Sequence, residues 1–351
     1  MNSNLILIPT KGMSEEQWLL HRQDGIGGSE TGTVMLQNKW ESQLELYHRK
    51  IGASPLVKHT NESMMWGHLH EDTIAKAWEY YDGSIEGMIK RLALGKEHKF
   101  RRNRRLNCIV KNPDYPHLLG NIDRVINKGQ VMIFDGEILE TEGILEIKTV
   151  KEFAMKMWEA EVPPMYMLQF YAYMGITGLR YTELAVLKDG SSMDVIPFYF
   201  KQEIFDSILE WTIPFWERVK KGRLLMNELR LAEMSGERRA IEDLKDMLDQ
   251  NEPPFDPRDA TARTQYLNKR YTAESYCVRG GMEQYEAARS YMRAHAQMGE
   301  LTEQKDHWGS IIKGFMKNHN EMDFGDPGLG TVTWKADKNG TRSLKMNKIT
   351  A

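Results

Sequence analysis

Apolar and polar positions near the start of the chain follow the spacing of short helices. Ser14 and Gln17 are three residues apart, as in a capping box, and predict a helix from there onward. The glycine-rich turn 25–28 leads into a second predicted helix. Ser42 and Glu45 repeat the capping-box spacing, so a third helix is expected to begin there.

The middle of the chain alternates with a period of two and therefore predicts strands. Side chains of a strand point to opposite faces in turn, so Glu146 and Lys148 share one face while Leu145 and Ile147 share the other. Asp123 lies within another predicted strand. If these two strands are neighbours, three charged groups converge on one face of the sheet. The predicted strands are 106–110, 118–126, 130–134 and 143–150, with a turn at 127–129.

After these strands the pattern returns to helices. Prolines 163 and 164 precede an apolar run, 166–174, which predicts a buried helix interrupted by one polar side chain, Gln169. Segments 180–187 and 192–200 then form a predicted hairpin. A helix over 203–222, kinked at Pro214, closes the first predicted domain, residues 1–222.

The remaining chain divides into two predicted parts. Residues 223–262 form a charged helix followed by a Pro-rich linker at 251–257. Residues 263–351 hold one or two long amphipathic helices and a β-hairpin around 337–340. Trp334 in this hairpin either packs on the helices or grips DNA.

Composition places the chain in a broad class. It has 351 residues, 41% of them hydrophobic and 28% charged, which is typical of a globular protein with a substantial core. No apolar run is long enough for a membrane span, and no signal-peptide pattern is visible. Two cysteines, Cys108 and Cys277, fit a reducing cytoplasm and are expected in or near the core.

The net charge of −3 hides a basic stretch. Between residues 90 and 105 eight lysines and arginines face a single acid, Glu97. Such a patch beside an acidic site can hold phosphates. Its members are Lys90, Arg91, Lys96, Lys99, Arg101, Arg102, Arg104 and Arg105.

The clustered charges in the predicted sheet suggest a metal centre. Two carboxylates held together repel each other unless a cation sits between them. Hard oxygen ligands suit Mg²⁺ or Mn²⁺, and Lys148 could position or deprotonate an attacking water. An acid-x-Lys triplet by itself is also common on the solvated face of an edge strand.

The order Asp123, then Glu146-Ile147-Lys148, resembles the active-site signature of the PD-(D/E)XK nucleases. The resemblance extends to the YqaJ and lambda-exonuclease family of phage recombination nucleases. Trp18, Arg22 and the Gly-Ile-Gly-Gly-Ser run that ends at Ser29 are similar to the opening motif of that family.

The resemblance implies a role for each matching residue. Arg22 and Ser29 would hold a 5′-terminal phosphate. The metal, one or two Mg²⁺ or Mn²⁺ ions, would be bound by Asp123, Glu146, the backbone carbonyl of Ile147 and, directly or through water, Glu71. Lys148 and Gln169 would complete the catalytic set.

Taken separately, some of these residues have simpler explanations. Ser29 could be only an N-cap, and the backbone could satisfy a buried Gln169. His68 and His70 are left out of the metal site, because oxygen-rich Mg²⁺ sites do not favour imidazole.

The implied fold is a restriction-endonuclease-like α/β core, a mixed central sheet flanked by helices, with a helical C-terminal region that ends in a hairpin. The implied activity is Mg²⁺-dependent 5′→3′ digestion of linear double-stranded DNA from its ends. Further implications are a single-strand annealing protein as partner, ring-like trimers as in relatives, and a phage- or prophage-encoded protein in the bacterial cytoplasm. A structure-specific or nicking endonuclease and a non-catalytic DNA-binding recombination module are the alternatives.

Overall fold

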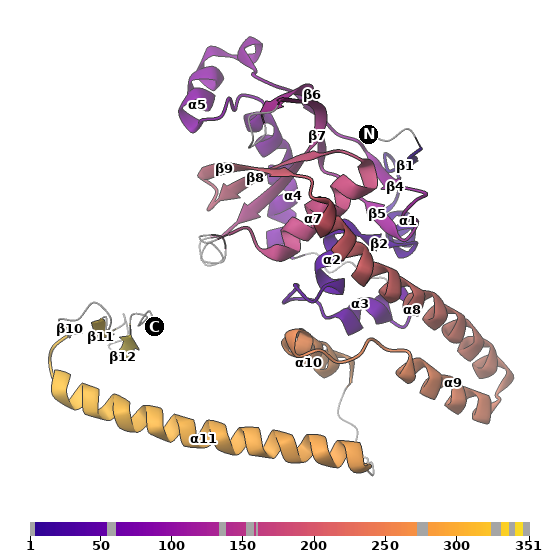
Figure 1. The fold of residues 1–351 in the computed structure, drawn as a ribbon, viewed down its shortest axis with the longest axis vertical. Coiled ribbons are helices and arrows are strands. Elements are labelled where there is room, and N and C mark those ends of the chain that lie inside the picture. Colours follow the sequence, from indigo (N-terminus) through magenta and orange to yellow (C-terminus); the bar gives the residue numbers. More distant parts are fainter. Residues whose placement is uncertain are drawn as a thin grey trace. The chain divides into compact units, whose positions relative to one another are not determined.

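The computed structural model describes residues 4–54, 61–132, 138–151, 158, 161–271, 280–323, 331–336 and 341–346. The chain divides into two compact units, Met1–Thr272 and Ala273–Ala351. The first unit contains two sheets and most of the helices, and the second contains one long helix and a small sheet (Figure 1).

The larger sheet of the first unit has five strands in the order β3-β6-β7-β8-β9. Strands β7 and β8 are parallel, and the other neighbours are antiparallel, so the sheet is mixed. The long strand β7 lies in its middle, which fits a sequence rich in Ile and Leu. The strands are β3 Asn103–Arg104, β6 Arg124–Met132, β7 Ile138–Val150, β8 Tyr181–Lys188 and β9 Ser192–Tyr199.

A smaller sheet joins the N-terminal segment to the strands that precede β6. Its order is β1-β4-β5-β2, and only the β2–β5 pair is parallel. The short β2 leads directly into helix α2, which begins at Gly28. The strands are β1 Ile6–Pro9, β2 Ile26–Gly27, β4 Cys108–Lys111 and β5 Leu118–Gly120.

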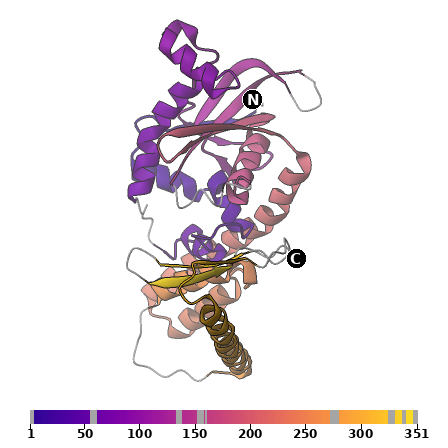
Figure 2. The same cartoon turned by 90° about the vertical axis from the view of Figure 1, so that its left-hand side faces the viewer.

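Helices cover both faces of the five-stranded sheet (Figures 1 and 2). Helix α4, Glu62–Trp78, packs on the face that carries Leu145 and Ile147. Helix α7, Pro164–Thr177, lies on the other face and shares a core with the β8 residues Leu184 and Val186. The alternation of β7 therefore sends apolar side chains to α4 and its charged side chains towards α7.

Other helices complete both units. In the first unit they are α1 Glu15–Gln23, α2 Gly28–Val34, α3 Gln43–Lys50, α5 Ile85–Leu94, α8 Gln202–Ser235, α9 Arg238–Gln250 and α10 Ala260–Arg270. The second unit has α11 Met282–Met316, β10 Glu321–Asp323, β11 Thr331–Ala336 and β12 Arg342–Met346. The predicted fold class, a mixed sheet between helices followed by a helical region that ends in antiparallel strands, is confirmed. Among the described residues, no helix is both long and apolar enough to cross a membrane.

Two predictions about the strands were wrong. The single strand predicted over 118–126 is broken, because the chain leaves the small sheet after Gly120 and enters the large sheet at Arg124. The turn predicted at 127–129 is an irregularity inside β6, where the pairing with β7 shifts register between Ile126 and Gly129. Pairing with the long β7 keeps this segment in the sheet.

The C-terminal half also differs from its predicted boundaries. Helix α8 runs through residue 222 to Ser235, where Gly236 ends it with a left-handed backbone conformation. The segment predicted as a linker is part of the first unit and packs against α8, since Arg218 Nη1 donates to the carbonyls of Asn251 and Glu252 at 3.0 Å. The predicted turn at 337–340 and Cys277 lie outside the described residues, whereas Cys108 is buried as expected.

Candidate active site

Asp123 lies at the point where the chain passes from one sheet to the other. The β6–β7 pairing begins at Arg124 opposite Leu145, so position 123 stands just outside the ladder. Its carboxylate satisfies a backbone donor of β7 that a paired strand would otherwise bind, because Asp123 Oδ2 accepts a hydrogen bond from the backbone N–H of Ile147 at 3.1 Å. The break between the sheets thus fixes this acid against β7.

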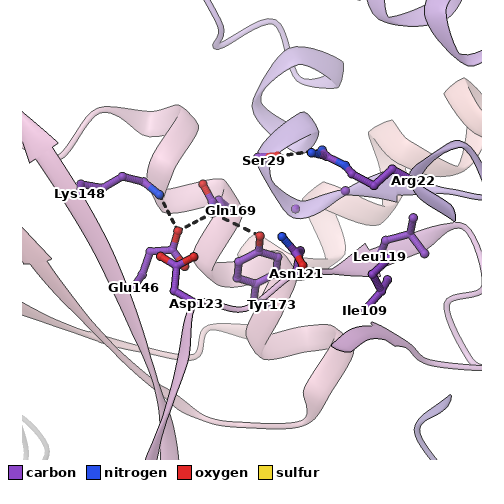
Figure 3. A pocket seen from close by; sticks show the side chains of 12 residues that line it. Arg22, Ser29, Ile109, Leu119, Asn121, Asp123, Glu146, Lys148, Gln169 and Tyr173 are labelled. Atoms are coloured by element: carbon purple, nitrogen blue, oxygen red, sulfur yellow. Dashed lines mark hydrogen bonds and ion pairs between the residues drawn. The ribbon is translucent and has the colours of Figure 1, made fainter. Parts of the chain in front are cut away.

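Glu146 is fully buried on the face of β7 that looks towards α7. One of its oxygens, Oε1, accepts hydrogen bonds from Lys148 Nζ and from Gln169 Nε2, each at 2.5 Å (Figure 3). Within the described structure, the other oxygen, Oε2, is buried without a partner. A buried carboxylate oxygen without a donor is costly, and it marks a place for a cation or water.

The electrostatics of this cluster are unbalanced. Burial, followed by the charge of Asp123, raises the pKa of Glu146 to about 8 against the opposing effect of Lys148. Burial also opposes a charge on Lys148, but Glu146 and Asp123 hold the pKa of its ammonium group above the usual range. Two neighbouring carboxylates with one cation favour the uptake of further positive charge.

The residues present fit a hard divalent ion. Asp123, Glu146 and the carbonyl of Ile147 are oxygen donors, and the unpartnered Oε2 of Glu146 is available to an ion. Among the described side chains, no three from Asp, Glu, His and Cys come together as a metal-binding group. An ion here would therefore rely on the backbone carbonyl and on waters for the rest of its coordination, as Mg²⁺ commonly does.

Glu71 stands beside this cluster rather than in its centre. It lies in the middle of α4, which begins at Glu62. Its carboxylate is 3.0 Å from Arg105 and 3.5 Å from Arg124, and burial followed by the charge of Asp123 raises its pKa. In this arrangement Glu71 faces two arginines, which suits an indirect contact with an ion through water.

Gly67 lets α4 approach β7. A Cβ atom at this position would stand 3.4 Å from Thr149 Oγ1, so the helix and the strand are in close contact there.

His68, which was left out of the predicted metal site, is 3.9 Å from Glu71, and its side chain is 78% exposed.

Arg22 and Ser29 meet at the other wall of the site. Arg22 comes from the last turn of α1 and Ser29 from the first turn of α2, and Arg22 Nη2 donates to Ser29 Oγ at 3.2 Å. The guanidinium also lies over the ring of Trp18, 4.9 Å from its centroid. The N-cap of α2 is Gly27, so Ser29 is not the cap, and its hydroxyl can face a ligand.

Tyr173 and Gly28 connect the two walls. The Tyr173 hydroxyl is 3.3 Å from Gln169 Nε2, and burial raises its pKa well above the usual value. A Cβ atom at Gly28 would stand 2.3 Å from the Tyr173 ring, so only glycine allows α2 to lie this close to α7. No sequence pattern marked Tyr173 as a site residue, although it stands one helical turn after Gln169.

A buried ionic cluster supports the Arg22 wall and was also missed. Glu30 accepts from the N–H of Gly27 at 2.7 Å, and its carboxylate lies 2.8 Å from both Lys50 and Arg49. Burial alone would raise the pKa of Glu30, but Lys50, Arg22 and Arg49 hold it well below the usual range. The only sequence signal was a glutamate three residues after a glycine N-cap.

Lys50 is the least expected member of this ionic cluster. Its ammonium is buried, which lowers its pKa to about 8, and it donates to the backbone carbonyls of Arg22 at 2.7 Å and Gly25 at 2.6 Å. It thereby fixes the turn that carries Arg22 towards the pocket.

The two walls enclose a single pocket with a volume of about 130 Å³ (Figure 3). The figure shows the acids and Lys148 on one side and Arg22 with Ser29 on the other, with Tyr173 and Asn121 between them. The lining residues are Arg22, Gly27, Gly28, Ser29, Ile109, Leu119, Asn121, Asp123, Glu146, Lys148, Gln169 and Tyr173.

The basic stretch is less positive than its sequence suggests. Acidic partners neutralise six of its eight cations, for example Asp82 at 3.0 Å from Arg91 and Glu183 at 2.5 Å from Arg101. Within the described parts of the chain, the side chains of Lys96 and Arg102 have no acidic partner. The other paired residues are Lys90, Lys99, Arg104 and Arg105, with Glu86, Glu79, Glu142 and Asp72.

Comparisons with known proteins agree with the sequence resemblance. Residues 17–180 match the family model described as the YqaJ-like viral recombinase domain. The chain is 26% identical over 349 residues to the uncharacterized protein YqaJ of Bacillus subtilis strain 168, a match that covers 97% of this chain and 90% of that one. A crystal structure of an alkaline exonuclease from Laribacter hongkongensis is 16% identical, with a TM-score of 0.43, and covers 62% of this chain and 99% of its own. The same exonuclease in complex with dAMP gives 16% identity and a TM-score of 0.42, and covers 63% of this chain and 98% of its own.

Proposed function

We propose that the chain is a metal-dependent deoxyribonuclease of the YqaJ-like viral recombinase family, whose model matches residues 17–180. Its substrate would be the end of linear double-stranded DNA, digested in the 5′→3′ direction. The observation that carries the proposal is the single pocket in which Arg22 and Ser29 face Asp123, Glu146 and Lys148.

In this proposal the residues on the Asp123 and Glu146 side of the pocket catalyse hydrolysis of the phosphodiester. Asp123, Glu146 and the carbonyl of Ile147 would hold one or two Mg²⁺ or Mn²⁺ ions, which when bound would supply a Lewis acid and activate a water. Glu71 supports the ion through water. Lys148 orients the attacking water and offsets negative charge on the attacked phosphate.

The remaining residues position the reacting groups. Gln169 donates to Glu146 Oε1, and Oε2, which has no partner among the described residues, would be free to bind the ion. Arg22 and Ser29 hold the 5′-terminal phosphate through charge-assisted hydrogen bonds. Lys96 and Arg102 supply the positive charge of the basic stretch that is left to contact the DNA backbone.

The biological setting follows from the family. Digestion of one strand exposes the other, to which a single-strand annealing protein of a phage recombination system would bind in the bacterial cytoplasm. A ring-like trimer of the nuclease units would keep the enzyme on its DNA.

A time course on end-labelled DNA tests the proposal. With Mg²⁺, linear duplex that carries a 5′-phosphate should shorten from the 5′ end, whereas covalently closed circles should survive and EDTA should stop digestion. Cleavage of circles or of branched junctions would indicate an endonuclease instead. Retention of DNA without any metal-dependent cleavage would leave only a DNA-binding module.

A further inference from the structure

Helix α11 carries a row of large apolar side chains that the rest of its own unit leaves exposed. It is 35 residues long, which corresponds to roughly 52 Å. Single exposed apolar residues are common, but large apolar side chains that recur along one face of an exposed helix mark a contact surface. Five members of the row are each more than 60% exposed: Tyr291, Met298, Leu301, Trp308 and Phe315.

The row follows a seven-residue repeat. Tyr291, Met298, Lys305 and Ile312 recur every seven residues, and a second series is offset from them by three. These are the a and d positions of a coiled coil, and a repeat sustained over four heptads or more is the sequence signature of a helix–helix seam. The second series consists of Ala287, Ala294, Leu301, Trp308 and Phe315.

The small sheet of the second unit leaves this row open. The sheet lies at the C-terminal end of α11 (Figures 1 and 2), where Met316 and Val332 are buried. A Cβ atom at Gly309 would stand 3.9 Å from Leu344. Gly309 and Met316 occupy the e positions beside the seam, so the sheet covers one flank of the helix.

We propose that the row pairs with the same helix of a second copy of this chain, in antiparallel orientation. If the two-fold axis passes between residues 299 and 300, each a position faces a d position of the other copy. Met298 then faces Leu301, and Tyr291 faces Trp308. Lys305 faces Ala294, where the short side chain leaves its long stem room to reach water.

A parallel pair of the same helices is disfavoured. It would place Lys305 against Lys305 and Trp308 against Trp308, while the alanines at 287 and 294 would face each other across a gap. Like charges in a seam repel, and both overpacking and cavities destabilise a core. The order of small and large residues along α11 is therefore self-complementary only when the two helices run in opposite directions.

The pairing is independent of the proposed nuclease activity, since α11 lies in a unit that contributes no residue to the pocket. Its consequence is a dimer contact outside the nuclease core, which can join two first units whatever reaction they perform.

Sedimentation of the full-length chain and two matched variants tests the contact. The wild type should sediment at twice the mass of the assembly that the first units form by themselves, and Met298→Glu, which puts two carboxylates into the seam, should raise the dissociation constant of this pairing about a hundredfold. Met292→Glu makes the same chemical change at an outer position of the same helix, 71% exposed, and should leave the pairing intact. Circular dichroism of each variant would verify that α11 remains helical.

Charge exchange at Ala294 tests the orientation. In the antiparallel pair Ala294→Lys opposes Lys305 and should weaken the dimer, Ala294→Glu should keep or tighten it, and Lys305→Glu should restore the Ala294→Lys dimer. In a parallel pair Ala294→Lys and Ala294→Glu would weaken it alike, which would overturn the orientation. A wild type with the same mass as Met298→Glu, or a pairing that survives Met298→Glu, would overturn the contact itself.

Discussion

Two buried glutamates stand behind opposite walls of the same pocket and have opposite electrostatics. Glu30 and Glu146 are 3% and 0% exposed. Cations and a backbone N–H contact both oxygens of Glu30, and its pKa is held low. Oε1 of Glu146 accepts two hydrogen bonds, whereas Oε2 has no partner among the described residues. The pKa of Glu146 is raised to about 8.

The difference shows how burial alone fails to identify a role. A buried carboxylate whose partners are complete holds the fold, because its removal leaves the surrounding cations unpaired. A buried carboxylate whose partners are incomplete marks a candidate binding site. We therefore expect substitutions around Glu146 to affect mainly catalysis and substitutions around Glu30 to affect mainly stability.

The largest effect is expected on cleavage when the incomplete cluster is changed. Asp123→Ala, Glu146→Gln and Lys148→Ala should each lower the rate of DNA hydrolysis by at least about a thousandfold, since they remove metal ligands or the group that orients water. Their unfolding free energy and DNA binding should change little. Digestion of labelled linear duplex would measure the rates, urea denaturation the unfolding free energies, and retention of the same duplex the DNA binding. A variant that cuts at the wild-type rate would remove its residue from the site.

The next largest effect is expected on stability when the complete cluster is changed. Glu30→Gln leaves Lys50 buried without its carboxylate and should lower the free energy of unfolding by roughly 3–5 kcal/mol. Glu41→Gln is the matched control, because Glu41 is also an acid bound to Arg49, at 2.6 Å, but is less buried. Urea denaturation should therefore show a clearly smaller loss for Glu41→Gln, and equal losses would contradict the special role of Glu30.

The contribution of Glu30 to the free energy of unfolding should depend on pH in the acidic range. Its folded pKa lies below its unfolded value of 4.5, so its contribution is present above pH 4.5 and is lost as the pH falls further. Wild-type stability should fall more steeply between pH 5 and 3 than that of Glu30→Gln. Parallel curves from thermal melts of the two proteins would mean that the ion cluster does not stabilise the fold.

The smallest effect is expected at the end-binding wall. Arg22→Ala should slow digestion of 5′-phosphorylated ends by roughly tenfold and change 5′-hydroxyl ends little, because one charge-assisted contact is lost. Arg49→Ala removes another cation from Glu30 but does not line the pocket. It should lower stability without changing the ratio of the two rates, which initial velocities on paired substrates would measure.

Local patterns were enough to predict most elements around the pocket. The alternation in β7 placed Glu146 and Lys148 on one face, and the prolines at 163 and 164 marked the start of the helix that carries Gln169. The family resemblance supplied the pairing of Arg22 with Ser29, which the structure brings within 3.2 Å.

Features that depend on distant contacts were not predictable in this way. The passage from one sheet to the other occupies three residues, too few for a periodic signal. Lys50 reads as an ordinary surface cation at the end of α3, and only the folded chain brings Glu30 and the carbonyl of Gly25 to it. Continuation of α8 past 222 likewise depends on packing, since Leu225 and Leu229 are buried beyond that point.

The short passage from Gly120 to Arg124 also bears on the size of what the enzyme would release. Arg22 and Ser29 are carried by segments next to the small sheet, whereas Glu146 and Lys148 belong to the large one. The backbone crossing at Asp123 connects these two supports through three residues, and Asp123 also accepts a hydrogen bond from β7. Under the proposed function, the distance between a terminus held on one support and the bond cut on the other would set how many nucleotides leave at each step.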